Sequence, residues 1–152
     1  MLPDFLLASL HHLLFFGLIV MLAVQSALLS RPIDAAVLKR LSGIDRGYGL
    51  TAVLLLFAGG ARLFFGVKGS AYYLHNPWFH AKMGAFVLAA ALSLWPTLAF
   101  LRWRRQLHAN AAWTPDRAQV ARLRSIVHIE FALIALILVL AAGMARHGGL
   151  SF

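Results

Sequence analysis

The segment Asn76-Pro77-Trp78-Phe79-His80-Ala81-Lys82 stands directly before the apolar run MGAFVLAAALSLWPTLAFL, residues 83–101. Asparagine followed by proline is a turn signal, and the run behind it carries no charged side chain. Together with Phe79–Lys82, the run is long enough to cross a bilayer core, which takes about 20 helical residues. The segment therefore predicts a membrane span over residues 79–101 that starts in an aromatic and polar interface.

Three further apolar runs of similar length occupy Phe5–Leu29, Tyr48–Val67 and Ile126–Ala145. The chain has 152 residues, 61% of them hydrophobic, and little sequence remains between the runs for a soluble domain. We therefore predict an all-α fold. It is an integral membrane four-helix bundle that forms one domain over residues 1–152.

Positive charge is concentrated in two of the connections. The first and third carry four and six Lys and Arg residues, whereas the N-terminus carries none. By the positive-inside rule, these connections lie in the cytoplasm and both termini lie outside, in the periplasm. The net charge of +9 arises at these helix ends, so it does not indicate a nucleic-acid partner. Within the first connection, Ala35–Leu41 fits a short interfacial helix. The basic residues of the two connections are Arg31, Lys39, Arg40 and Arg46, then Arg102, Arg104, Arg105, Arg117, Arg122 and Arg124.

The predicted orientation brings four short segments to one depth, in the outer third of the membrane. They are Ala8–His12, Ala58–Arg62, His80–Gly84 and Leu140–Gly143. All four contain small residues, which let membrane helices approach closely. Two of them also contain histidine, which favours the alternative that the small residues leave room for a flat ligand.

Histidines at matched depth on two spans are typical of a haem site, which needs imidazole nitrogens pointing into a dry slot. His11 or His12 from the first span and His80 from the third are candidate axial ligands of the iron. Gly84 lies one turn from His80 on the same face and would leave room for the ring. Cations that could meet the propionates at this depth are Arg62, Lys68 and Lys82.

Only one of His11 and His12 can face the other spans, since adjacent helical residues point about 100° apart. The stripe of residues through His12 contains more small side chains than the stripe through His11. This count mildly favours His12 as the histidine that faces the interior.

A copper site, in a small-solute transport component, is the first alternative to haem. His11, His12, His75 and His80 would form an imidazole-rich site, which suits copper. The chain has no cysteine, which excludes disulfides, iron–sulfur clusters and thiolate metal sites. A second alternative is an accessory membrane protein without a cofactor, in which His80 and Lys82 only anchor the third span.

Another group of polar residues lies in the inner third of the spans, where ionisable side chains are functional candidates by default. Glu130 is expected to pair with Arg46, Arg124 or His128, as a structural ion pair at the cytoplasmic interface. The alternative is a proton path or a second site. The group comprises Gln25, Ser26, Asp45, Arg46, Ser93, His128 and Glu130.

Three stretches of the chain resemble known membrane proteins. They are Ser9-Leu10-His11, the basic segment from Lys39-Arg40-Leu41 to Tyr48, and Trp78-Phe79-His80-Ala81-Lys82. They are similar to those of an uncharacterised family of four-helix bacterial membrane proteins. More distantly, they resemble HemJ-type protoporphyrinogen oxidases and CopD-type copper proteins. The third stretch matches a Trp-x-His-x-Lys pattern and is the most specific.

This resemblance implies a haem-b-binding bundle in the bacterial inner membrane and, for the HemJ type, oxidation of protoporphyrinogen IX. It favours His11 over His12. Where the HemJ fourth span carries glutamate-proline, this chain has His128-Ile129-Glu130-Phe131. We therefore predict a haem-b membrane oxidoreductase or electron carrier. Besides membrane lipid, its expected partner is a quinone or a porphyrin substrate.

Overall fold

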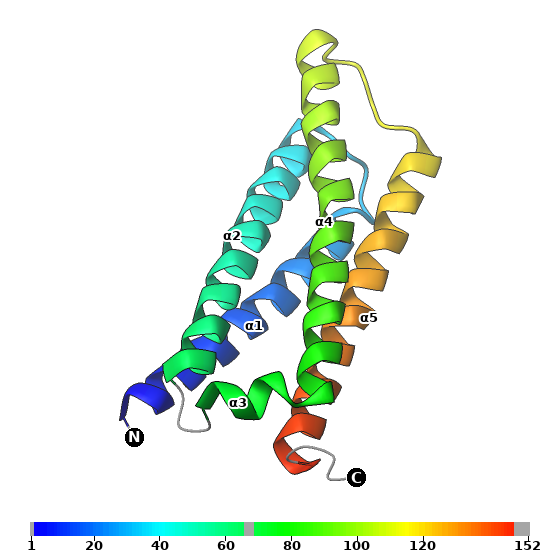
Figure 1. The fold of residues 1–152 in the computed structure, drawn as a ribbon. Helices are drawn as coiled ribbons and strands as arrows, with labels where there is room; N and C mark the ends of the chain where they lie inside the picture. Colours follow the sequence, from blue (N-terminus) through cyan, green and yellow to red (C-terminus); the bar gives the residue numbers. More distant parts are fainter. Residues whose placement is uncertain (1, 66–68, 148–152) are drawn as a thin grey trace.

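The structure, a computed structural model, describes residues 2–65 and 69–147, and this part of the chain is helical with short connections and no strand. Four helices are long and the third is short (Figure 1). Their bounds are α1 Leu2–Leu28, α2 Ala35–Phe65, α3 Gly69–Leu74, α4 Pro77–Ala109 and α5 Arg117–His147. The predicted all-α four-helix bundle is confirmed.

The four long helices pack in a closed ring. α1 contacts α2, α2 contacts α4, α4 contacts α5, and α5 contacts α1. Consecutive long helices run in opposite directions, so the two ends of the chain lie at the same end of the bundle (Figure 1). The short helix α3 connects α2 to α4 there. Each of the four long helices is long and apolar enough to cross a membrane.

The helices extend well past the predicted spans at the end opposite the termini. α2 begins at Ala35 rather than at Tyr48, so the predicted interfacial helix is its first part. α4 continues to Ala109, and α5 already begins at Arg117. The 33 residues of α4 correspond to about 50 Å, against about 30 Å of hydrocarbon core. The predicted end of the second span, Val67, lies outside the described residues, as does Lys68.

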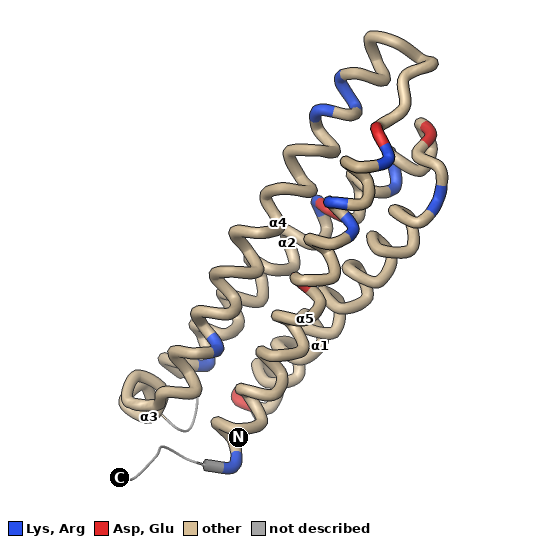
Figure 2. The backbone as a smooth tube through the Cα atoms, turned by 90° about the vertical axis from the view of Figure 1, so that its right-hand side faces the viewer, with Lys and Arg blue, Asp and Glu red and all other residues tan. Residues whose placement is uncertain are grey.

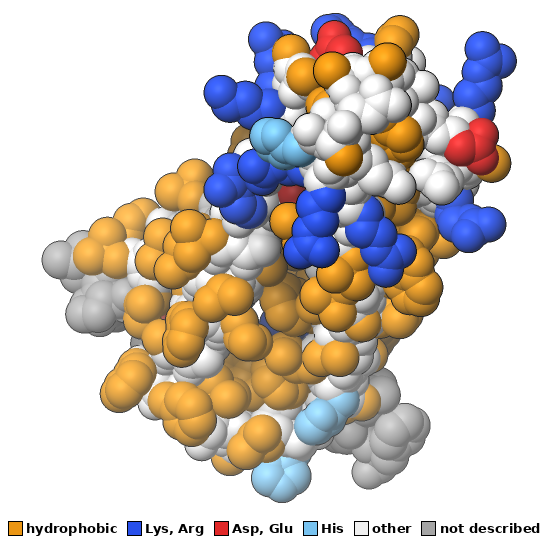
Figure 3. All heavy atoms as spheres, turned by 90° about the horizontal axis from the view of Figure 1, so that it is seen from above, with side chains coloured by type: hydrophobic (Ala, Val, Ile, Leu, Met, Phe, Trp, Pro, Cys, Tyr) orange, Lys and Arg blue, Asp and Glu red, His pale blue; other side chains and the backbone are white. Residues whose placement is uncertain are grey.

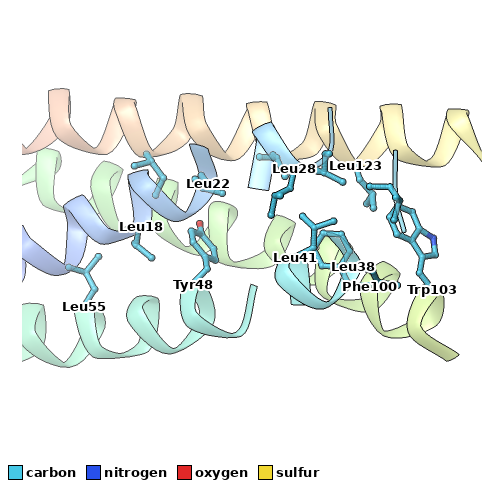
Figure 4. Close-up of a cluster of buried hydrophobic side chains, with 14 of the residues drawn as sticks. Leu18, Leu22, Leu28, Leu38, Leu41, Tyr48, Leu55, Phe100, Trp103 and Leu123 are labelled. Atoms are coloured by element: carbon cyan, nitrogen blue, oxygen red, sulfur yellow. The ribbon is translucent and has the colours of Figure 1, made fainter. Parts of the chain in front are cut away.

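Buried side chains explain why the extensions are helical. Leu41, Phe100 and Trp103 are at most 3% exposed and pack in one cluster with Leu123 (Figure 4). The Trp103 indole Nε1 also donates to Gln119 Oε1 at 3.3 Å, joining α4 to α5. Leu41, Trp103 and Leu123 were predicted to lie in the connections, but they form a small core with Phe100 at the end of the predicted third span.

The Asn-Pro pair begins α4. The Asn76 side chain is buried, and its Oδ1 accepts a hydrogen bond from Trp78 N at 3.0 Å. Pro77 takes the first helical position, where its missing N–H costs nothing. The turn signal is thus a helix N-cap. The helix α3 just before it was not predicted from the sequence.

Charge divides the bundle along its length. Most Lys and Arg residues gather at the end formed by the start of α2, the end of α4 and the start of α5 (Figure 2), which we call the basic end. Viewed from that end, their side chains surround the tip, and hydrophobic side chains cover the flanks (Figure 3). Phe16, Phe57 and Val139 are more than 60% exposed on those flanks. Such a belt fits contact with lipid tails.

A close contact between α4 and α5 gives a first prediction. A Cβ atom built on Gly143 would lie 3.0 Å from Cε3 of Trp78. Gly143→Leu should therefore destabilise the bundle, since overpacking costs about 1–3 kcal/mol. Thermal unfolding in detergent would show a lowered midpoint. The matched control is Gly49→Leu, because Gly49 is exposed and has nothing within 4 Å of the added atom. Equal midpoints for the two variants would contradict this contact.

Candidate functional site

A cavity of about 240 Å³ lies between the helices near the end that carries the termini. We call it the outer cavity. All five helices contribute to its lining, from Phe15 of α1 to Met144 of α5. Most lining side chains are apolar, and the charged or titratable lining groups are His11, Arg62, Lys82 and the Tyr73 hydroxyl. Three of the four segments predicted at one depth contribute to the lining, namely Ala8–His12, Ala58–Arg62 and His80–Gly84, whereas α5 contributes Ile137 and Met144 on either side of the predicted Leu140–Gly143.

The His11 ring packs against α2 at Gly59. A Cβ atom at Gly59 would be 3.2 Å from Cε1 of the His11 ring. Because glycine has no Cβ atom, the ring can pack closely against α2 at this position. The ring hydrogen-bonds with the backbone of Leu55, one turn earlier in α2. Its Nδ1 is buried and has no hydrogen-bond partner. One nitrogen of this imidazole is therefore available to a ligand.

Two cations face the same cavity. Arg62 and Lys82 interact electrostatically with His11 and with each other. Arg62 Nε is buried without a hydrogen-bond partner, and Lys82 Nζ lies 5.6 Å from the centroid of the Phe79 ring. The described residues that line the cavity include no carboxylate. Two like charges in an apolar setting repel each other, so an anion placed between them would be stabilised.

His80 does not reach the outer cavity. Its side chain is exposed, and Nε2 hydrogen-bonds with the Leu74 carbonyl oxygen at 2.8 Å. Gly84 is exposed too, with open space around it, so the face that these two residues share points away from the cavity. Lys82 lies on the opposite face and does line it. The structure thus brings together His11 and Lys82, and not the predicted ligand pair His11 and His80.

The face of α1 that turns inward is the one through His11. Phe15, Leu18, Leu22 and Gln25 are all at most 7% exposed, whereas His12 is exposed. The count of small residues favoured the other face and was wrong. Small side chains on a lipid-exposed helix do not by themselves mark its packed face, because lipid tails accept them as well.

The residues present fit a haem in part. An orphaned imidazole nitrogen, two cations and an apolar wall are the groups that haem b needs. Among the described side chains no second histidine lines the cavity, and His12 and His80 are exposed. The arrangement therefore suits an iron held by one histidine, not by two.

The imidazole-rich copper site is not assembled. The described residues contain no group of three or more His, Cys, Asp or Glu side chains that could hold a metal ion. His75 Nδ1 bonds to the Ala71 carbonyl oxygen at 2.9 Å, and His80 bonds to Leu74. Both histidines thus satisfy the backbone of α3 and its C-terminal turn.

A separate polar group lies in the interior between the two ends. Glu130 is 1% exposed, Tyr48 4% and Asp45 7%. The Tyr48 hydroxyl donates to Glu130, and Asp45 hydrogen-bonds with Thr97. The Tyr48 ring points from α2 into the space between the helices (Figure 4). These contacts connect α2 to α5 and to α4.

None of the three predicted partners of Glu130 is the one observed. Arg46 is exposed and donates from Nε to the Ser42 carbonyl oxygen at 3.3 Å. His128 lies 2.9 Å from Ser26 Oγ, and Arg124 is exposed. The prediction of an ion pair was wrong. His128 and Arg124, two and six residues before Glu130 on α5, point to other faces, whereas Tyr48 faces Glu130 across the bundle.

Tyr48, Thr97 and Tyr73 are the residues that the sequence did not single out. Tyr48 was expected to be the interfacial start of a span, and the early start of α2 moves it inside. Thr97 carried no signal within an apolar run. Tyr73 sits on α3, which was not predicted. Each of these three residues matters through its position against another helix. A local sequence pattern does not show which residues of two helices will face each other.

Comparison with known proteins gives one match. The family model described as "Predicted membrane protein (DUF2214)" matches residues 3–149. The chain belongs to this family. No curated protein and no solved structure matches the chain. Membership in this DUF2214 family agrees with the four helices that are long and apolar enough to span a membrane.

The Tyr48–Glu130 hydrogen bond gives a second prediction. Tyr48→Phe should lower stability by about 1–3 kcal/mol, because the buried carboxyl loses its donor. The double variant Tyr48→Phe/Glu130→Leu removes both polar groups and should recover part of the loss. A double-mutant cycle, measured by thermal unfolding of wild type, Tyr48→Phe, Glu130→Leu and the double variant, gives the coupling between the two side chains. A Tyr48→Phe variant as stable as wild type would show that the hydroxyl does not stabilise Glu130.

Proposed function

We propose that the outer cavity binds haem b and that the protein is a membrane oxidoreductase or electron carrier. One observation carries the proposal. His11 presents a buried nitrogen without a partner in the same cavity as the two cations Arg62 and Lys82. Imidazole is a common axial ligand of haem iron. Guanidinium and ammonium groups form charge-assisted hydrogen bonds with carboxylates such as the propionates.

Bound there, haem would supply a one-electron redox centre. The residues of the chain would then have three tasks. His11 would bind the iron, and Arg62 and Lys82 would hold the propionates. Apolar lining side chains such as Phe15 and Phe86 would keep water from the ring. A dry, apolar surrounding is one of the means by which a protein sets a haem potential.

The HemJ-like pattern supports this proposal in a modified form. Its lysine, Lys82, lines the outer cavity together with His11, the histidine that the resemblance favours. Its histidine, His80, bonds to the backbone outside the cavity. Oxidation of a porphyrinogen, with a quinone as electron acceptor, is the specific activity that we propose on this resemblance.

Replacing single histidines tests the haem proposal. Wild-type protein expressed with ample haem and purified should show a Soret band that shifts on reduction. His11→Ala should abolish it, because no other described cavity residue offers an imidazole. His12→Ala and His80→Ala are the matched controls and should keep the band, since both side chains are exposed. Wild-type protein without a Soret band would refute the proposal, as would its loss in the His80 variant alone.

The size of the cavity favours a second candidate, the head group of a quinone. Ligand sites commonly enclose about 300–1,000 Å³, and the outer cavity measures about 240 Å³. A single ring fits that volume more readily than a macrocycle, and Arg62 and Lys82 could donate to its carbonyl oxygens. Organic extraction of the purified protein, followed by chromatography, would recover a quinone in place of a Soret band. Loss of the quinone in Lys82→Met would assign it to this cavity.

We further propose that the protein lies in the bacterial inner membrane with its basic end in the cytoplasm and both termini in the periplasm. The concentration of Lys and Arg at one end of the bundle supports this orientation.

The absence of cysteine makes the orientation directly testable. Ser70→Cys on α3 and Ala111→Cys at the basic end each place one thiol at an exposed position. With the outer membrane permeabilised, a membrane-impermeant maleimide should label the Ser70 variant. The Ala111 variant should react only after the inner membrane is opened. The reverse pattern would invert the orientation.

A further inference from the structure

Two carboxylic acids lie together inside the bundle, away from the outer cavity. Glu130 of α5 is 1% exposed and Asp45 of α2 is 7% exposed. The two interact electrostatically with each other. Glu130 Oε1 is buried without a hydrogen-bond partner, and so is Nε2 of Gln25 on α1, which is 2% exposed.

Within residues 2–65 and 69–147, no cation neutralises this pair. The interaction partners of Glu130 are Tyr48 and Asp45, and neither is positively charged. α1 carries no ionisable residue from Leu13 to its end, and α4 carries none from Met83 to Leu101. On α5 itself, His128 bonds to Ser26 and Arg124 is exposed. The neighbouring Arg46 of α2 bonds to the Ser42 carbonyl oxygen.

Two unneutralised carboxylates in such a setting are strongly disfavoured, because each buried charge loses its hydration. Like charges at close range add repulsion, and such pairs share a proton. Electrostatics thus requires that the pair carry at least one proton or a bound cation.

The groups around the pair favour a proton over a metal ion. Thr97 of α4, whose hydroxyl lies 3.0 Å from the Ser93 carbonyl oxygen, is the hydrogen-bond partner of Asp45. A metal ion is disfavoured, since the described residues contain no group of three metal-binding acidic or imidazole side chains.

A polar route reaches the pair from one side. At the basic end, a cavity of about 430 Å³ is lined by Ser42 and Arg46. The Ser42 hydroxyl is buried and unpartnered, one turn of α2 from Asp45. Toward the outer cavity the interior is apolar, with Leu18, Leu55 and Ile134 at most 4% exposed. Figure 4 shows Leu18 and Leu55 beside Tyr48.

We propose that Asp45 and Glu130 form a proton-binding site, which holds one proton between the two carboxyl groups and exchanges it with water at the basic end. The site does not depend on what the outer cavity binds, and it goes beyond the predicted ion pair by identifying the ligand as a proton. An exchangeable proton at this position suits a protein that couples proton uptake to chemistry elsewhere in the membrane.

Dicyclohexylcarbodiimide tests for a protonated carboxyl group in the membrane interior. The carboxyl O–H adds across a C=N bond of the reagent, and the adduct rearranges to a stable acylurea that keeps the full reagent mass. Mass spectrometry of the labelled full-length protein should place the adduct on Asp45 or Glu130, with less adduct as the pH rises. Exposed Asp34 and Asp116 are internal controls and should stay unlabelled. Absence of an adduct, or labelling that ignores pH, would overturn the proposal.

Carboxyl variants and a comparison of two salts test whether the adduct forms on this pair and whether the bound ion is a proton. Asp45→Asn/Glu130→Gln should lose the adduct completely, and each single variant identifies which carboxyl reacts. Sodium chloride should protect no better than choline chloride at the same pH. Selective protection by sodium would mean that the site binds a metal cation, and would overturn the assignment to a proton.

Infrared spectroscopy gives a readout that needs no labelling and tests the route. A protonated carboxyl C=O band should appear in wild type, shift on transfer to D₂O, and vanish in the double variant. Ser42→Leu should slow the shift, whereas Leu63→Trp, which fills the outer cavity, should not. A band that does not shift in D₂O would contradict the proposal, because the proton would then not exchange with water. If only Leu63→Trp slowed the shift, water would reach the pair from the outer cavity and not from the basic end.

Discussion

The need to pair every backbone N–H and C=O group away from water governs this protein. In a hydrocarbon core an unpaired peptide group costs several kcal/mol, which leaves helices as the solution for a chain of this kind. Four long helices satisfy that need within each segment. Once the backbone is satisfied, burial of apolar area adds little between helices, because lipid tails are as apolar as leucine. Contacts at small residues and hydrogen bonds between helices then decide how the bundle closes.

Small residues act differently at different places in the ring of helices. Gly143 brings α5 close to the Trp78 indole of α4, and Gly59 makes room on α2 for the imidazole of His11. Gly84 and Gly49 meet nothing and face outward. The outer cavity therefore does not result from a general thinning of the helices. It forms where α2 is narrow opposite the larger side chains of α1 and α4.

The polar interior is divided into two parts of opposite charge. In the part of the chain that the structure describes, Arg62 and Lys82 meet at the outer cavity without an acidic lining residue, and Asp45 and Glu130 meet further inside without a cationic partner. Neither group neutralises the other, because the apolar layer of Leu18, Leu55 and Ile134 separates them. Each group gains from a ligand of the opposite charge. This is the physical basis for an anionic or electron-rich ligand in the cavity and for a proton at the carboxyl pair.

The sequence by itself determined the all-α membrane fold, the number of long helices and the concentration of basic residues at one end. These follow from local hydropathy and charge, which do not depend on how the helices pack. It also predicted a common depth for the outer segments, since depth depends only on position along each span, and three of those segments contribute residues to the outer cavity. Only the tertiary structure decided that His11 faces inward and His80 outward, and that Glu130 meets Tyr48 instead of an arginine. Those choices depend on the rotation of each helix about its axis, which the contacts with neighbouring helices fix.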